Sequence, residues 1–202
     1  PDPIALDVIP SKLADIRRDY GIPEGKKMFL MYGAIESRKN AVKIMQALGS
    51  LKRCELENIC VVFAGRVRSE IKEEFYKLYN NLKSENIILK DAGFLPYEEI
   101  FSLCNLTDYI FALYKNTNQS SGTFAYACVF QKTIIAAKKG LLWRIVKKFK
   151  MGVGINADSA EEIAEIFRTP PAFTPDKALL RKYEQSHAIC NFCDSIERNI
   201  LK

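Results

Sequence analysis

The sequence predicts an α/β fold, a Rossmann-like, doubly wound and mainly parallel sheet of about six strands. Short apolar runs alternate with amphipathic helical segments along most of the 202 residues, and this alternation is typical of βαβ units on a parallel sheet. Several of the runs are apolar at every position, as expected of strands that are buried on both faces.

Six apolar runs are the predicted strands, because each is short and ends at a glycine or a polar loop. In chain order they span residues 28–32, 59–64, 87–89, 109–113, 133–137 and 152–155.

Helices are predicted between these strands from apolar residues at helical spacing and from capping residues. Ser11 is expected to cap the first helix, which runs to about Tyr20, and Asp158 or Ser159 to cap the helix at 160–167. The prolines at 170 and 171 should end that helix, and a long closing helix is expected over 176–201. The other helices are predicted at 41–51, 70–82, after Pro96, after Thr123 and at 141–149.

The predicted domain organisation is a linker at 1–10 followed by one domain over 11–202. Pro1, Pro3 and Pro10 favour extended backbone, whereas the rest of the chain has the apolar content of a single hydrophobic core. The chain contains no run of about 18 apolar residues, so no membrane-spanning helix is predicted. It begins without Met, and we expect it to be a piece of a longer protein.

The formal net charge of +6 predicts an attraction to partners that carry phosphate. Nucleic acid is not an expected partner, because the chain shows no recognised nucleic-acid-binding module and no interleaved basic and aromatic stripe. Cations gather between Lys138 and Lys150 among apolar residues. That pattern is typical of a basic helix on an anionic membrane, or of a helix that covers the sheet and has a solvated face. We favour the covering helix, with at most a weak peripheral membrane contact.

Six cysteines are interpreted as free thiols of a protein in a reducing cytoplasm. Cys190 and Cys193 have the C-x-x-C spacing, and His187 lies about one helical turn before them. A structural zinc site needs four ligands, and a thioredoxin-like pair follows a strand. We therefore interpret the pair as two thiols in a helix and predict no metal site.

Ligands of doubly wound sheets bind beyond the carboxyl ends of the strands, near the reversal of strand order. The loops expected at that edge are 33–40, 65–68, 91–96 and 114–123. The last loop ends in Ser120-Ser121-Gly122-Thr123 at the predicted start of a helix, where free amides and hydroxyls favour an anion. A simple capping turn is the alternative interpretation.

A series of motifs between residues 91 and 136 occurs in a specific order: Gly93-Phe94-Leu95, Glu98-Glu99-Ile100, Thr107-Asp108-Tyr109 and Gly122 through Ala136. With the segments at 29–48 and 152–166, this series resembles the donor-binding half of GT-B glycosyltransferases of the group-1 type, which use nucleotide-sugars. The resemblance implies one half of a GT-B fold. It also implies that 1–10 is the linker from a missing N-terminal acceptor-binding domain.

The same resemblance implies that the loop after the first strand holds the donor diphosphate. Gly33 and Lys39 match the family's pattern, whereas Ala34 stands where the family usually has arginine, and Arg38 is a candidate substitute. Arg66, after the second strand, is a further candidate. Solvated loop charges and an ordinary strand-end turn are the alternative interpretations.

Phe94 and Leu95 resemble the turn on which the family packs its nucleobase, with plain core packing of Phe94 as an equal alternative. Asn118 and Tyr126 fall where many family members carry two glutamates, one for the sugar and one for the ribose hydroxyls. Both side chains can form hydrogen bonds, but they should bind a ribose diol more weakly than a carboxylate does. The resemblance implies that the pyrophosphate is held by Ser120, Ser121, Gly122 and Thr123.

These observations predict an enzyme, a glycosyltransferase whose co-substrate is a nucleotide diphosphate sugar and whose acceptor is a hydroxyl group. The resemblance implies retention of the anomeric configuration without metal or other cofactor, and the chain has no Asp-x-Asp motif. No catalytic residue is assigned, and the fragment alone should bind nucleotide without transferring sugar. The alternative is a degenerate, non-catalytic GT-B-like domain that serves as a binding or partner subunit. A dinucleotide-dependent oxidoreductase is disfavoured, because no G-x-G-x-x-G follows the first strand.

Overall fold

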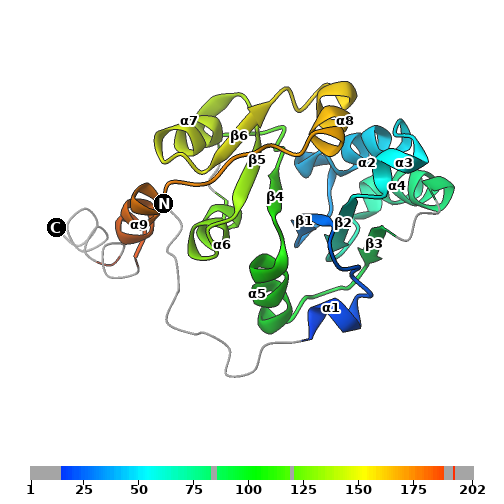
Figure 1. Cartoon of the computed structure of the whole chain (residues 1–202), viewed down its shortest axis with the longest axis horizontal. Helices are drawn as coiled ribbons and strands as arrows, with labels where there is room; N and C mark the ends of the chain where they lie inside the picture. The colour runs from blue at the N-terminus through cyan, green and yellow to red at the C-terminus, as the bar shows by residue number, and fades with distance from the viewer. Residues whose placement is uncertain (1–14, 83–85, 119–120, 189–192, 194–202) are drawn as a thin grey trace.

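The structure is a computed structural model that describes residues 15–82, 86–118, 121–188 and 193. The predicted linker at 1–10 lies outside the described residues, as do Ser11, Ser120 and Cys190. Within the described ranges the chain forms a central sheet with helices packed on both of its faces (Figure 1).

The six predicted strands are all present: β1 Lys27–Tyr32, β2 Ile59–Ala64, β3 Ile87–Lys90, β4 Tyr109–Ala112, β5 Thr133–Ala137 and β6 Gly152–Ile155. They form one sheet in the order β3-β2-β1-β4-β5-β6, and every pair in it is parallel. The strand order reverses between β1 and β4, which is the switch point of a doubly wound fold. The predicted fold class is therefore confirmed.

The helices follow the predicted positions closely, and two short ones were not predicted. None of the helices that the structure describes is long and apolar enough to span a bilayer. In chain order the helices are α1 Ile16–Asp19, η1 Ser37–Lys39 (a 3-10 turn), α2 Ala41–Gly49, α3 Arg53–Leu56, α4 Ser69–Leu82, α5 Tyr97–Leu106, α6 Thr123–Val129, α7 Gly140–Lys148, α8 Ala160–Arg168 and α9 Lys177–Ser186.

Two hydrophobic layers sandwich the sheet because its strands are apolar on both sides. Phe29 and Met31 of β1 face a layer that α2, α4 and α8 cover. Met28 and Leu30 face the opposite layer, which α5, α6, α7 and α9 cover. Alternate residues of one strand thus enter different cores, as the period of two in a strand requires.

Side-chain hydrogen bonds define one end of α1 and one end of α9. Asp15 caps α1 by accepting a hydrogen bond from the Arg18 amide, so α1 begins at Ile16. The predicted cap at Ser11 lies outside the described residues. The expected closing helix over 176–201 is interrupted, since α9 ends at Ser186, and its remainder at 189–192 and 194–201 lies outside the described residues. The Ser186 hydroxyl donates to the Tyr183 carbonyl at 2.7 Å, and the His187 amide closes the last turn. A side-chain hydrogen bond of this kind competes with the helical backbone pattern.

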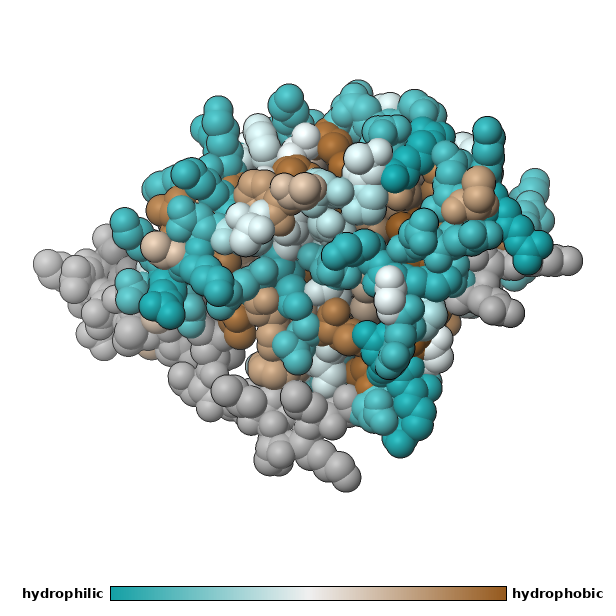
Figure 2. All heavy atoms as spheres, viewed as in Figure 1, coloured by the Kyte–Doolittle hydropathy of each residue, from teal (hydrophilic) through white to brown (hydrophobic). Residues whose placement is uncertain are grey.

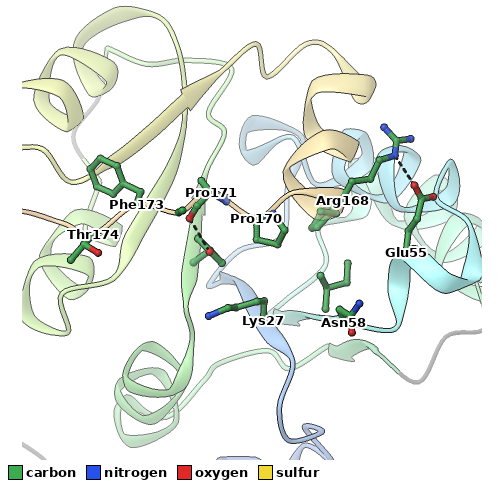
Figure 3. Close-up of a pocket in the computed structure, with 12 residues that line it drawn as sticks. Lys27, Glu55, Asn58, Arg168, Pro170, Pro171, Phe173 and Thr174 are labelled. Carbon is green, nitrogen blue, oxygen red and sulfur yellow. Dashed lines mark hydrogen bonds and ion pairs between the residues drawn. The ribbon is translucent and has the colours of Figure 1, made fainter.

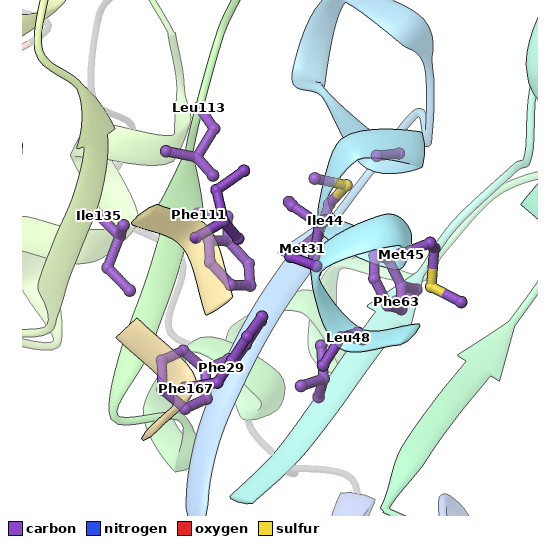
Figure 4. Close-up of a cluster of buried hydrophobic side chains, with 14 of the residues drawn as sticks. Phe29, Met31, Ile44, Met45, Leu48, Phe63, Phe111, Leu113, Ile135 and Phe167 are labelled. Atoms are coloured by element: carbon purple, nitrogen blue, oxygen red, sulfur yellow. The ribbon is translucent and has the colours of Figure 1, made fainter. Parts of the chain in front are cut away.

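Phe29 lies at the centre of the larger core, where strands from both halves of the sheet meet (Figure 4). Its ring stacks on Tyr109 of β4 at 4.7 Å between centroids and meets the edge of Phe167 from α8 at 5.0 Å. The side chain is completely buried. The aromatic contact therefore joins β1, β4 and α8 at the switch point.

We predict that Phe29→Ala lowers the free energy of unfolding by about 3–5 kcal/mol, because the lost ring leaves a cavity in a packed interior. Phe94→Ala is the matched control, since Phe94 is 84% exposed and its truncation should change stability by less than about 0.5 kcal/mol. Urea unfolding followed by circular dichroism measures both. Equal losses of stability would contradict this description of the core.

Candidate functional site

The loops after β1 and β4 meet at the carboxyl edge of the sheet, where the strand order reverses. The Lys115 amide donates a hydrogen bond to the Arg38 carbonyl at 2.8 Å. The Arg38 guanidinium also lies over the Tyr114 ring, 5.0 Å from its centroid. The candidate cations of the first loop and the loop that leads to α6 are thus directly joined.

Tyr114 connects this junction to the start of α6. Its ring is buried, and its hydroxyl is hydrogen-bonded to Ser121 Oγ at 2.7 Å and to Thr123 Oγ1 at 3.0 Å. The Thr123 amide in turn donates to Ser121 Oγ at 3.3 Å. Gly122 between them is exposed and has helical backbone angles. One phenol therefore holds two of the four residues predicted to bind pyrophosphate, while Ser120 lies outside the described residues.

Lys39 is mostly buried beneath the first loop. Its ammonium group donates to the Tyr32 carbonyl at 2.6 Å. Burial lowers the pKa of Lys39 to about 8, an effect that Glu36 opposes and Arg38 assists. Gly33, with φ of +77°, leaves room for this arrangement, because a β-carbon there would lie 3.3 Å from Lys39 Nζ. The site therefore contains a cation whose charge changes near neutral pH.

Arg38 is not a free cation. Its guanidinium forms an ion pair with Glu36 at 2.8 Å. The sequence did not single out Glu36, although a carboxylate two residues before a candidate arginine is a visible signal. An anion that binds here would share Arg38 with Glu36.

Gly65 packs directly on the first loop. A β-carbon at Gly65 would lie 2.0 Å from the Gly33 carbonyl oxygen, and Gly65 has φ of +134°, so the position requires glycine. The following residue, Arg66, accepts a hydrogen bond from the Ile35 amide through its carbonyl. The Arg66 side chain is exposed, and the described part of the chain provides no recorded ion pair for it.

The two apolar residues of the turn after β3 differ in solvent exposure. Leu95 is 4% exposed and belongs to the core, whereas Phe94 is 84% exposed. Core packing of Phe94, one of the two sequence interpretations, is therefore wrong. Phe94 is available to cover a planar ligand, and the Leu95 side chain contributes packing.

Asn118 and Tyr126 have different surroundings. Asn118 is exposed at the end of the loop, and its amide is bonded to Asn116 Oδ1 at 3.1 Å. Tyr126 meets the edge of Tyr32 at 5.8 Å and lies 6.3 Å from Tyr97. Burial and the neighbouring Tyr97 raise the pKa of Tyr126 well above its usual value, so its phenol stays neutral.

Tyr32 is a second residue that the sequence did not single out. Its hydroxyl is buried at the end of β1 and has no hydrogen-bond partner among the described protein groups. Burial raises the pKa of this phenol strongly. A tyrosine that ends an apolar strand at the switch point was the available signal, and the same signal applies to Tyr114 after β4.

Thr117, in the loop between β4 and α6, packs against the first residue of α7. A β-carbon at Gly140, the first residue of α7, would lie 1.9 Å from Thr117 Oγ1, and Gly140 has φ of +69°. The Leu142 amide also donates to the Thr117 carbonyl at 3.2 Å. The loop before α6 and the first turn of α7 are therefore packed against each other.

A pocket of about 810 Å³ lies at the opposite, amino-terminal edge of the sheet and is distinct from this site (Figure 3). Lys27 and Tyr109 begin their strands there, and the segment from Pro170 to Thr174 crosses above them. Arg168 and Glu55 form an ion pair at 2.9 Å at one end of the pocket. A pocket of about 510 Å³ adjoins the candidate site instead and is lined partly by Ser37, Asn40, Lys115 and Asp158.

The fold and the edge define a class: a doubly wound domain with a cation-bearing loop and a hydroxyl-bearing helix start at its switch point. The family model for glycosyl transferases group 1 matches residues 14–169, so the chain belongs to that family. A search of curated protein sequences gives no match.

Solved structures share the fold at low sequence identity. Anabaena Alr3699/HepE, in complex with UDP and glucose, is 16% identical with a TM-score of 0.72 over 96% of this chain and 53% of its own. A UDP-forming trehalose-phosphate synthase from Burkholderia xenovorans, in complex with glucose-6-phosphate, is 9% identical with a TM-score of 0.69 over 92% of this chain and 46% of its own. WaaG, a glycosyltransferase of lipopolysaccharide biosynthesis, is 16% identical with a TM-score of 0.61 over 93% and 50%. The chain thus spans about half the length of the structures it matches and corresponds to one half of a GT-B fold.

We predict that the Lys39 ammonium group titrates near pH 8, well below the usual lysine pKa of about 10.4. NMR of protein with ¹³C-labelled lysine measures the titration, and Lys39→Arg assigns the resonance by removing it. Because the pKa of Lys39 is lower in the folded state, its contribution to the unfolding free energy should rise with pH from about 8 to 10.5. A Lys39 titration midpoint at the usual lysine pKa of about 10.4 would contradict its burial.

Proposed function

We propose that this chain is the donor-binding half of a glycosyltransferase that moves a sugar from a nucleoside diphosphate to a hydroxyl acceptor. The observation that carries the proposal is the junction of the two loops at the switch point. Lys39 and Arg38 lie on one loop, and Tyr114 links that loop to the hydroxyls of Ser121 and Thr123. The two joined loops therefore carry basic and hydroxyl side chains, which are the groups that recognise a diphosphate.

Transfer of the sugar leaves additional negative charge on the diphosphate. A fixed cation that contacts this group stabilises the transition state more than the ground state. Lys39 suits this role, because an approaching anion favours its protonated form and the surrounding protein already excludes water. The reaction in this proposal proceeds with retention and without a metal ion.

Exposed Phe94 supports a contact with the base, since its ring is free to cover a planar group. Asn118 and Tyr126 supply an amide and a neutral phenol for sugar and ribose hydroxyls. Neither group is a carboxylate, so affinity should depend on the diphosphate more than on the ribose.

The second half of the enzyme is part of the proposal. The chain covers about half of the structures it matches, and the acceptor and any group that activates it would belong to the other half. HepE is described in complex with UDP and glucose, so UDP is the first ligand to test.

A non-catalytic domain is the alternative, and the Arg38–Glu36 ion pair favours it by engaging one of the two loop cations. Turnover by the full-length protein with a mixture of nucleotide-sugars separates the two proposals. Nucleotide binding by a full-length protein that transfers no sugar would support the non-catalytic domain.

We predict that the chain binds at least one of UDP, GDP and ADP in a calorimetric titration and transfers no sugar alone. Lys39→Met should weaken that binding roughly ten- to a hundredfold, because it removes a charged hydrogen-bond donor. Lys77→Met, on the exposed side of α4, is the matched control and should leave affinity unchanged. An absence of binding for all three nucleotides at millimolar concentration would exclude the proposed donor site.

A further prediction concerns Tyr114, which we expect to act by positioning the two hydroxyls. Tyr114→Phe keeps the ring under Arg38 and removes the hydrogen bonds to Ser121 and Thr123. Affinity for the nucleoside diphosphate should fall about fivefold, the effect of a typical lost hydrogen bond, while affinity for the monophosphate stays constant. Tyr79→Phe on α4 is the control. An equal loss for both nucleotides would indicate a structural defect.

A further inference from the structure

The excess positive charge of the chain is concentrated on α7 and its two ends. The stretch 138–150 contains six Lys and Arg residues and no Asp or Glu, and the net charge of the whole chain is +6. The rest of the chain therefore carries equal numbers of basic and acidic residues. This distribution is independent of the candidate donor site.

The helix has an inner face and an outer face. Leu142 and Val146 are buried against the sheet, which confirms α7 as a covering helix. Arg144, Lys147 and Lys148 are exposed on the other side. We call these three residues the α7 cationic face.

Carboxylates do little to neutralise the stretch. Among the described residues, the cations of the stretch 138–150 form one ion pair, between Lys139 and Asp158 at 3.0 Å. The Arg144, Lys147 and Lys148 side chains have no recorded ion pair with a described residue. Lys148 Nζ lies over the Phe149 ring at 5.1 Å from its centroid, and this contact leaves the charge without a counter-ion in the described part of the chain.

A second helix extends the charged area. The Asp176 amide donates to the Lys150 carbonyl at 3.3 Å, and Phe149 meets the edge of Tyr183 at 5.0 Å. These contacts bring the start of α9 beside the end of α7. The exposed cations that α9 adds are Lys177, Arg181 and Lys182.

Partly exposed apolar side chains flank the cationic face. Leu141 and Ile145 lie on one side of it, and Trp143 lies on the other, where its ring packs over Gly154. Figure 2 shows hydrophilic residues interspersed with apolar ones over the upper left of the molecule, where α7 lies. A face of this kind combines electrostatic attraction with shallow apolar insertion.

We propose that the α7 cationic face docks this domain on an anionic phospholipid bilayer. Lysine and arginine gain free energy near a negatively charged headgroup surface, and Trp143 suits the boundary between headgroups and acyl chains. The aliphatic flank of Leu141 and Ile145 favours a bilayer over a nucleic acid, because it offers phosphates and bases no polar group. The docking surface has complementary charge and contains the apolar residues that would enter the bilayer.

The test is co-sedimentation of the chain with vesicles of phosphatidylcholine alone or mixed with phosphatidylglycerol. Binding is expected for the mixed vesicles only, and it should weaken as salt screens the charges. Equal binding to both vesicle types, or no binding to either, would overturn the proposal. The salt series needs no variant and so does not depend on the folding of one.

Charge variants locate the contact. Replacing the cationic face by glutamine (R144Q, K147Q and K148Q) should lower the partition onto mixed vesicles on the order of a hundredfold at low ionic strength. The matched control removes three exposed cations elsewhere (R53Q, K72Q and K77Q) and should change the partition much less. Equal losses for the two variants would show attraction by net charge alone and overturn the proposal. Thermal unfolding confirms that both variants fold.

Trp143 supplies an independent measurement, because it is the one tryptophan in the sequence. Its emission should shift to shorter wavelength and its quenching by iodide should fall when mixed vesicles are added. Binding of an RNA homopolymer tests the alternative that the surface recognises nucleic acid. Tight RNA binding that the cationic-face variant loses, without any vesicle-induced shift of Trp143, would assign the surface to nucleic acid instead.

Discussion

The hydrogen bond from the Lys115 amide to the Arg38 carbonyl joins two loops where the strand order reverses. Beyond the last paired residues of β1 and β4, the sheet itself no longer holds these loops together. On the other side of the first loop, Gly65 lies so close to the Gly33 carbonyl that no β-carbon fits. The first loop is therefore fixed from both sides by backbone contacts. These contacts therefore position the backbone that carries Arg38 and Lys39.

Burial and ion pairing limit the charge of the titratable side chains at this edge of the sheet. One cation is buried and has a pKa of about 8, and the other is paired with Glu36. The phenols of Tyr32 and Tyr126 remain neutral because burial disfavours their ionised forms. A strongly anionic ligand would shift these balances, since it stabilises charged Lys39 and competes with Glu36 for Arg38. In the proposed donor site, an anion would therefore change the charge state of Lys39 and the pairing of Arg38.

The sequence was sufficient for the strands because runs such as 59–64 and 134–137 are apolar throughout and are followed by glycine or lysine. It was insufficient for α3 and η1, since helices of three or four residues are too short to show a period. The loops of the site could be predicted from strand ends. The exposure of Phe94, the burial of Leu95 and the role of Tyr114 could not, because each depends on neighbours from distant parts of the chain.

The loop after β4 packs against Gly140 of α7, a contact that the sequence of the loop does not predict. Thr117 occupies the space that a β-carbon at Gly140 would need, so the loop and the first turn of α7 are in direct contact. The same β-carbon would lie 3.6 Å from Asn118 Oδ1, so the contact extends to the last described residue before the gap at 119–120. A side chain at position 140 would therefore displace Thr117 and alter the loop before α6.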